Sequence, residues 1–299
     1  MRYHVPVLLN ESIKGLSIKP NGTYLDLTFG GGGHSRGILK ELVKGNLISF
    51  DSDLDAININ DISNDNFEVI HSNFKFFDLH IKERGINSVD GIFADLGVSS
   101  YQIDSDNRGF TYKGKTELDM RMNKKNDLCA KIILNEYNLE HLNDILYQYG
   151  EISNSKKIAE KIINHRQKKF IKYNSDFVNL LNTIFQKKIG YKLLSKFFQA
   201  IRIEVNDELN TLKQMLIKTV NSLNKGGRLV IISYHSLEDR LVKNFINKSN
   251  FGSDYKKNLF GIKQQFFKRI NKKPIIPQDY EIKNNPRSRS AKLRIGEKL

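Results

Sequence analysis

The chain has 299 residues, enough for one large or two medium domains with a real core, and carries 48 Lys and Arg residues against 33 Asp and Glu residues. The formal net charge of +15 favours a polyanionic partner such as nucleic acid, although a bias toward Asn and Ile could also raise the Lys content. The single cysteine, Cys129, excludes an internal disulfide and a thiolate zinc site. The N-terminus does not have the pattern of a signal peptide, and no apolar run approaches the ~20 residues that a membrane span needs. We therefore expect a cytoplasmic protein.

Short apolar strands alternate with helical stretches over the first third of the chain. This pattern predicts an α/β fold with a parallel sheet covered on both faces. A glycine loop at 30–33 follows the first strand. We expect Ser35 to cap the helix 35–43, and Asp53 to cap the short helix after the second strand. The four expected strands are 23–28, 46–51, 67–70 and 89–96.

The alternation stops near Asn107, and the segment up to Ser195 is polar and helical. The helical run at 156–170 carries apolar residues at Ile158, Ile162 and Ile163. The α/β pattern then resumes with one long amphipathic helix from Ile203 to Leu223, a turn at Gly226-Gly227, a strand at 229–232 and a helix beginning at Ser236. The basic segment from Lys263 onward should finish the sheet. We therefore predict an α/β domain in two parts, 1–106 and 196–299, around an inserted helical domain, 107–195.

A ligand site is predicted where the first two strands end. In an open parallel sheet, ligands bind beyond the carboxyl ends of the strands, where the strand order reverses. Four consecutive glycines, 30–33, let a ligand approach bare backbone N–H groups at a helix N-terminus, although they could simply form a tight turn. Asp51 ends the second strand, where a carboxylate can accept hydrogen bonds from both ribose hydroxyls. Both NAD and S-adenosylmethionine need that acid. Gly37 lies inside the following helix, as the last glycine of an NAD-binding loop does, so NAD remains an alternative cofactor.

Three more positions bear on the cofactor. Asp26, before the glycines, could face the ammonium of S-adenosylmethionine or organise the loop. Phe74, after the third strand, is placed to contact an adenine or to pack in the core. Asp95 ends the fourth strand, the position at which a methyltransferase presents the substrate amine to the methyl group.

Taken in order, these and later motifs resemble the bacterial ribosomal RNA small-subunit methyltransferase H family, also called MraW. The resemblance implies a Rossmann-like S-adenosylmethionine-dependent methyltransferase sheet with an inserted helical substrate-recognition domain. It implies N4-methylation of a cytosine in the decoding region of small-subunit ribosomal RNA. This activity uses S-adenosylmethionine and so excludes NAD as the cofactor. The matching segments are 4–9, 26–35, 95–100 with Gln102, 108–110, 118–122, 198–209, 226–240 and 285–290. The implied cofactor contacts are Gly32, Gly33, His34, Asp51, Phe74, Asp95 and Gln102.

The sequence departs from the family pattern at three places. Tyr101 stands where the family usually has proline, Thr116-Glu117 where it usually has Gly-Pro, and residues 192–197 where it usually has His-Pro-Ala-Thr-Arg-Thr. These departures flank the expected RNA face and leave the cofactor loop intact, so they bear on substrate geometry.

Two residues are candidates for the chemistry. The N4 amine of cytosine is a poor nucleophile, because its lone pair is delocalised into the ring. The Asp95 carboxylate or the Leu96 carbonyl could accept its hydrogens, but Asp95 could equally be a cofactor ligand without a catalytic role. His235 could contact a flipped base or relay a proton, whereas Ser236 and Asp239 have the spacing of a helix-capping box.

RNA recognition should come from charge and stacking. The basic helical run 156–172 could track phosphates or be a solvated face, and Arg287, Arg289, Lys292 and Arg294 form a second basic group. We expect small-subunit ribosomal RNA, within an assembled or nearly assembled subunit, as the partner, with no metal and with a homodimer left open. A noncatalytic RNA-binding assembly factor that retains the fold is the alternative. The candidate substrate-binding residues are Ser99, Tyr101, Arg108, Asp119, Arg121, Asn206, Arg287 and Arg289, with Phe110 and Tyr234 as further stacking aromatics.

Overall fold

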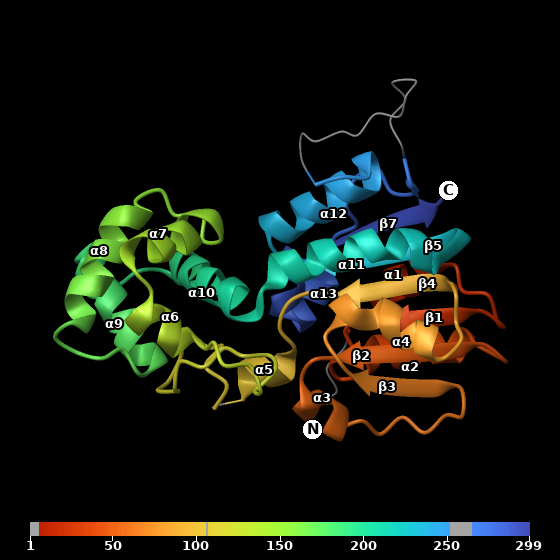
Figure 1. Ribbon diagram of the computed structural model, residues 1–299, viewed down its shortest axis with the longest axis horizontal. Coiled ribbons are helices and arrows are strands. Elements are labelled where there is room, and N and C mark those ends of the chain that lie inside the picture. The colour runs from red at the N-terminus through yellow and green to blue at the C-terminus, as the bar shows by residue number, and fades with distance from the viewer. Residues whose placement is uncertain (1–5, 106, 252–264) are drawn as a thin grey trace. The chain divides into compact units, whose positions relative to one another are not determined.

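The computed structural model describes residues 6–105, 107–251 and 265–299, which form two compact units (Figure 1). An α/β unit comprises Met1–Gly97 and Leu209–Leu299, and a helical unit comprises Val98–Glu208. The helical unit thus extends past the range 107–195 at both ends. His4 and Val5 of the matching segment 4–9, and Lys263 at the start of the basic segment, lie outside the described residues. None of the helices in these described ranges is long and apolar enough to span a membrane.

The α/β unit is built on one seven-stranded sheet with the order β3-β2-β1-β4-β5-β7-β6. The first five strands in this order are parallel, and β7 runs antiparallel to both β5 and β6. The order reverses between β1 and β4, so the carboxyl ends of β1, β2 and β4 meet where ligands bind in such sheets. The predicted α/β fold is confirmed. The strands are β1 (Thr23–Asp26), β2 (Asn46–Asp51), β3 (Phe67–His71), β4 (Val89–Asp95), β5 (Leu223–Ser233), β6 (Phe267–Arg269) and β7 (Lys292–Lys298).

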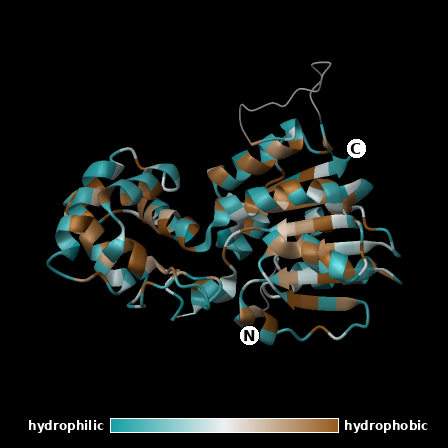
Figure 2. Ribbon diagram, viewed as in Figure 1, coloured by the Kyte–Doolittle hydropathy of each residue, from teal (hydrophilic) through white to brown (hydrophobic). Residues whose placement is uncertain are grey.

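Hydrophobic clusters cover both faces of the sheet, and the central strands β4 and β5 contribute apolar runs to them (Figure 2). Along β5, Leu229 and Ile231 join one cluster, while Val230 and Ile232 join the other, as the two-residue period of a strand requires. The first cluster packs against α4 (Phe77–Glu83), α11 (Glu208–Ser222) and α12 (Ser236–Lys248), and the second against α1 (Leu9–Leu16) and α2 (Gly33–Glu41). The short helices are α3 (Leu54–Asn58), η1 (Phe74–Phe76), α13 (Asp279–Asn284) and η2 (Pro286–Ser290).

The helical unit has its own core, centred on residues such as Phe177 and Phe197. The predicted amphipathic run becomes α8, in which Ile158 and Ile162 are buried. The helices of this unit are α5 (Ser100–Asp104), α6 (Ala130–Glu136), α7 (Leu139–Gln148), α8 (Ser155–Arg166), α9 (Asn174–Phe185) and α10 (Tyr191–Asn206).

Two predicted elements differ in the structure. The prediction of a single helix over 203–223 is wrong. Helix α10 ends at Asn206 and α11 begins at Glu208, because Asp207 takes a left-handed conformation with φ of 49°. Aspartate tolerates that conformation better than most residues. The turn at Gly226-Gly227 lies inside β5 as a bulge: Val89 pairs with Leu223, whereas Gly91 pairs with Arg228.

The helix caps of the α/β unit are partly as predicted. Asp53 caps α3, as expected, by accepting the N–H of Asp55 at 3.1 Å. The prediction that Ser35 caps a helix is wrong, because α2 begins at Gly33 and the Ser35 hydroxyl donates to the buried Asp26. Ser236 is also wrong as a cap, because His235 is the N-cap of α12.

Candidate active site

The glycine turn after β1 has a shape that larger residues would not adopt. Gly32 has a φ of +71°, and a Cβ atom at Gly33 would lie 2.3 Å from Cγ of Pro6. Gly31 is exposed, and a Cβ atom there would meet nothing within 4 Å. The turn therefore packs against Pro6 on one side and leaves backbone open to a ligand on the other, at the start of α2.

Asp51 ties the glycine turn to the end of β2. Its Oδ2 accepts the N–H of Gly30 at 2.8 Å, and its Oδ1 accepts the N–H of Asp53 at 2.8 Å. Burial raises the pKa of this carboxyl to about 6. The side chain is only partly buried, and each carboxylate oxygen has a second lone pair. Asp51 therefore retains the acceptor capacity that a ribose diol requires.

Asp26 organises the loop from inside the fold. It is completely buried, its Oδ1 accepts the N–H of Thr28 at 3.1 Å, and its Oδ2 accepts the Ser35 hydroxyl at 2.6 Å. Ser35 Oγ also lies 2.9 Å from Ser49 Oγ. Burial raises the pKa of Asp26 to about 6. Of the two roles left open by the sequence, the structure supports loop organisation.

Asp95, at the end of β4, is held by hydrogen bonds to two neighbours and lies near a third. Its backbone N–H donates to Thr28 Oγ1 at 2.7 Å, and its Oδ1 accepts the Tyr234 hydroxyl at 2.8 Å. Its Oδ2 lies 3.9 Å from Nδ1 of His34. The side chain is 23% exposed, and burial raises the pKa of its carboxyl to about 7. This group therefore changes charge near neutral pH while one edge stays accessible.

The described α/β unit brings together most of the residues expected to bind the cofactor. Residues 28–30 are hydrogen-bonded to both Asp51 and Asp95, so the glycine turn and the two acids form one connected edge of the sheet. Phe74 lies in η1 after β3, half-buried against the core. Gln102 belongs to the helical unit, where its side chain accepts the N–H of Ser99 in the capping box of α5.

His235 has a structural role in this arrangement. Its Nδ1 accepts the N–H of Glu238 at 3.4 Å, and its Nε2 lies 3.2 Å from Oε1 of the same glutamate. Glu238 Oε2 in turn accepts the N–H of Tyr234 at 2.9 Å. Nδ1 of His235 thus caps α12, and a catalytic role for the ring stays a prediction.

Four of the predicted substrate-binding residues form a network within the helical unit. Arg108, only 1% exposed, donates to the carbonyls of Arg121 and Met122. Asp119 accepts the Arg121 guanidinium at 2.7 Å. Asn206 accepts the N–H of Met122 and donates to the carbonyl of Met120. These contacts shape the loop around residues 119–122, and any contact with RNA stays a prediction.

The remaining predicted substrate residues differ in accessibility. Tyr101 is 45% exposed, and Ser99 caps α5. Arg287 and Arg289 are exposed on η2. Arg294, in contrast, is buried and paired with Asp239 at 2.6 Å, so it does not belong to an exposed basic group.

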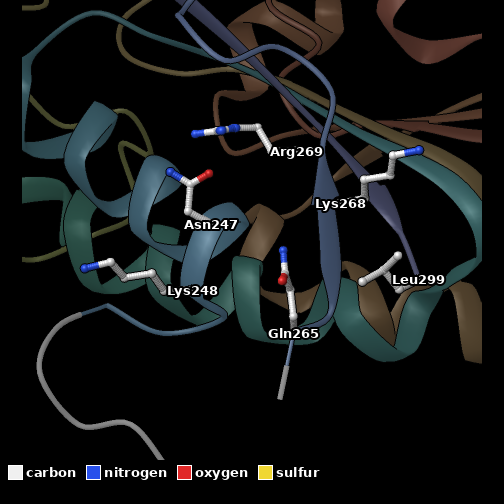
Figure 3. Close-up of a pocket in the computed structure, with 6 residues that line it drawn as sticks. All are labelled: Asn247, Lys248, Gln265, Lys268, Arg269 and Leu299. Carbon is white, nitrogen blue, oxygen red and sulfur yellow. The ribbon is translucent and has the colours of Figure 1, made fainter. Parts of the chain in front are cut away.

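A separate pocket of the α/β unit lies beside the C-terminal end of β7 (Figure 3). Because β7 is antiparallel to β5, this is the sheet edge opposite the glycine turn. Arg269 is exposed and lines this pocket. The pocket is therefore separate from the candidate active site. Its lining residues are Asn247, Lys248, Gln265, Lys268, Arg269 and Leu299.

Comparison with known proteins identifies the family. A model of the MraW methylase family matches residues 1–299. The chain belongs to the MraW methylase family. It is 46% identical over 299 residues to the "Ribosomal RNA small subunit methyltransferase H" of Bacteroides thetaiotaomicron, covering 100% of this chain and 98% of the relative. It is 47% identical over 299 residues to the protein of the same name from Parabacteroides distasonis, covering 99% and 98%.

Two solved structures similar to this MraW methylase have low sequence identity to it. An rRNA methylase from Streptococcus thermophilus aligns with a TM-score of 0.44 and 13% identity, covering 100% of this chain and 99% of the other. A putative methyltransferase from Streptococcus mutans in complex with SAH aligns with a TM-score of 0.41 and 14% identity, covering 99% and 100%. The family assignment rests on the sequence matches. The MraW methylases are S-adenosylmethionine-dependent methyltransferases, so the expected cofactor is confirmed.

Sequence reasoning missed one contact of this methylase, the Tyr234–Asp95 hydrogen bond. It considered Tyr234 only as a stacking aromatic, although Tyr234 follows β5 directly. Since β4 and β5 are neighbours in the sheet, their carboxyl ends lie side by side. The adjacency of Asp95 and Tyr234 could have been found by pairing the two strand ends.

Proposed function

We propose that this chain transfers a methyl group from S-adenosylmethionine to the N4 amine of a cytosine in the decoding region of small-subunit ribosomal RNA. The observation that carries the proposal is the connected edge of the sheet, where Gly30 donates to the Asp51 carboxylate and the N–H of Asp95 donates to Thr28. The names of the full-length relatives support the RNA class. The base and its position are supported by the family motifs in the sequence.

The residues at this edge fit the cofactor. The exposed backbone at Gly31, at the start of α2, suits the amino-acid end of the cofactor, and Asp51 suits its ribose hydroxyls. Phe74 would contact the adenine from the end of β3. The set of cofactor-binding residues that we propose is Gly32, Gly33, His34, Asp51, Phe74, Asp95 and Gln102.

Asp95 is the residue best placed to act on the target amine. S-adenosylmethionine, when bound, supplies the methyl group as an electrophile. The amine must lose one proton as it gains the methyl group, and its lone pair must be freed from the ring. A carboxylate that accepts an N–H hydrogen favours the pyramidal amine and holds it in line. Asp95, partly exposed and titrating near pH 7, suits both tasks.

RNA binding would involve both units. We propose that the helical unit recognises the substrate, with the exposed ring of Tyr101 available for stacking on a splayed base. Arg287 and Arg289 of the α/β unit are exposed and suit phosphate contacts. Arg108, Asp119, Arg121, Asn206 and Ser99 would act by shaping the loops that meet the RNA. The substrate would be an assembled or nearly assembled small subunit.

The test is transfer of labelled methyl from S-adenosylmethionine to small subunits that lack modifications, followed by nucleoside mass spectrometry. The proposal expects the label in N4-methylcytidine. Label on another nucleoside would contradict the cytosine assignment. Cofactor binding with no transfer to well-assembled particles would favour a noncatalytic assembly factor that retains the fold.

A further inference from the structure

Tyr234 is fixed in place from both its backbone and its side chain. Its N–H donates to Oε2 of Glu238 at 2.9 Å, and Glu238 is only 3% exposed. Its ring lies near Gly97, where an added Cβ atom would be 3.6 Å from Cδ2 of the tyrosine. Its hydroxyl donates to Oδ1 of Asp95 at 2.8 Å. The tyrosine therefore comes from the end of β5 to hold an acid at the end of β4.

The two oxygens of Asp95 have different surroundings. Oδ1 is engaged by Tyr234, whereas Oδ2 lies 3.9 Å from Nδ1 of His34, beyond hydrogen-bonding distance. Nε2 of His34 lies 3.0 Å from the carbonyl of Val7, and a carbonyl can only accept. In the neutral ring the proton is thus on Nε2, and Nδ1 is an acceptor. Within the described ranges, no donor contacts Oδ2.

We propose that Tyr234 is a positioning residue for methyl transfer: it holds the Asp95 carboxylate by Oδ1 and leaves Oδ2 for a hydrogen of the target amine. This inference rests on the proposed function. Tyr234 acts through Asp95 and does not touch the reacting atoms, so it differs from a base-stacking aromatic.

The charges around Asp95 explain why this contact matters. Burial raises the pKa of Asp95, and the carboxylates of Asp26 on β1 and Glu238 on α12 raise it further. The Tyr234 hydrogen bond lowers it. His34 from α2 is a further titratable neighbour among the described residues. Burial raises the pKa of Tyr234 well above its usual value, so the hydroxyl keeps its proton and donates throughout the working range.

Tyr234→Phe removes the hydroxyl and keeps the ring. A hydrogen bond to a charged group typically contributes enough to move a pKa by about one unit. We therefore expect the rising limb of the pH–rate profile for single-turnover methyl transfer to move up by about one pH unit. That shift makes transfer roughly tenfold slower below the midpoint and nearly unchanged at high pH. The affinity for S-adenosylmethionine should stay within about twofold. The matched control is Tyr280→Phe, since Tyr280 is an exposed tyrosine of the same unit.

A second measurement does not depend on methyl transfer. NMR titration of the ¹³C-labelled Asp95 carboxyl, assigned with Asp95→Asn, should show the same upward shift in Tyr234→Phe. If that variant does not fold, 3-fluorotyrosine at position 234 makes a stronger donor and should move the midpoint down.

An unchanged Asp95 midpoint, or a loss of rate by the same factor at every pH, would overturn the inference. Absence of methyl transfer by the unsubstituted protein would contradict the proposed function instead, and the NMR titration would still decide whether Tyr234 controls Asp95.

Discussion

Replacing Asp26 by Asn tests how the buried acid under the glycine turn affects stability. Asp26 is completely buried, and the rise of its pKa from 3.8 to about 6 is about two units. At 1.36 kcal/mol per unit, the folded state favours the protonated acid by about 3 kcal/mol at most. Asparagine fits the same site, because the Ser35 hydroxyl can accept from its amide and donate to Ser49 Oγ.

The sign of the effect follows from the raised pKa. Between about pH 4 and pH 6 the folded protein binds more protons at Asp26 than the unfolded chain, so the Asp26 contribution to stability falls as the pH rises. Above about pH 7 the loss is complete and constant. Asp26→Asn lacks this contribution. The stability of the variant relative to the unsubstituted protein should therefore improve by about 2–3 kcal/mol between pH 4 and pH 8.

The assay is urea unfolding at several pH values, followed by hydrogen exchange of peptides from β1 and β4, which reports on the α/β unit alone. Asp51 and Asp95 titrate in both proteins, and the Asp26 charge raises the pKa of each. Its removal lowers both pKa values, so their contribution to the difference has the same sign as that of Asp26. A stability difference that stays constant from pH 4 to pH 8 would refute the reasoning. So would a variant that becomes less stable, relative to the unsubstituted protein, as the pH rises.

Two further predictions concern ligand binding. Gly33→Ala should weaken S-adenosylmethionine binding by roughly tenfold to hundredfold in calorimetry, because the new Cβ atom meets Pro6. Gly190→Ala in the helical unit, where a Cβ atom would meet nothing within 4 Å, should have little effect, and equal losses in the two variants would contradict this. Replacing both Arg287 and Arg289 by Ala should weaken RNA binding. The slope of the logarithm of the binding constant against the logarithm of the salt concentration should become shallower by about one to two. Arg269→Ala, at the opposite edge of the sheet, is the control. An equal loss of RNA binding in that variant would show that binding depends on the net charge of the protein and not on the arginines of η2.

The elements that sequence reasoning predicted are those whose cause is local. The strands from Thr23 to Asp95 are apolar runs between turn residues, and the four glycines mark the ligand turn directly. Asp53 caps α3 through a residue two positions away. Such patterns need no knowledge of which strands are neighbours.

The structure differs from the sequence predictions where a contact with a residue distant in the sequence determines the local structure. Ser236 and Asp239 have the same spacing as His235 and Glu238, but Asp239 is bound by Arg294, 55 residues further on, so it is not available as a cap. Ser35 is recruited by Asp26 across the turn. The break at Asp207 interrupts a continuous amphipathic pattern next to the boundary between the two units. The Tyr234–Asp95 contact joins residues 139 positions apart, through the pairing of β4 with β5.

The most direct test of the proposed activity is to map the transferred methyl group on the RNA. Small subunits lacking modifications are incubated with S-adenosylmethionine and either the unsubstituted protein or Asp51→Ala, and ribonuclease fragments are weighed by mass spectrometry. We predict one added methyl group on a cytosine of the decoding region with the unsubstituted protein, and its loss with Asp51→Ala. A methyl group on another nucleotide, or undiminished transfer by Asp51→Ala, would contradict the account.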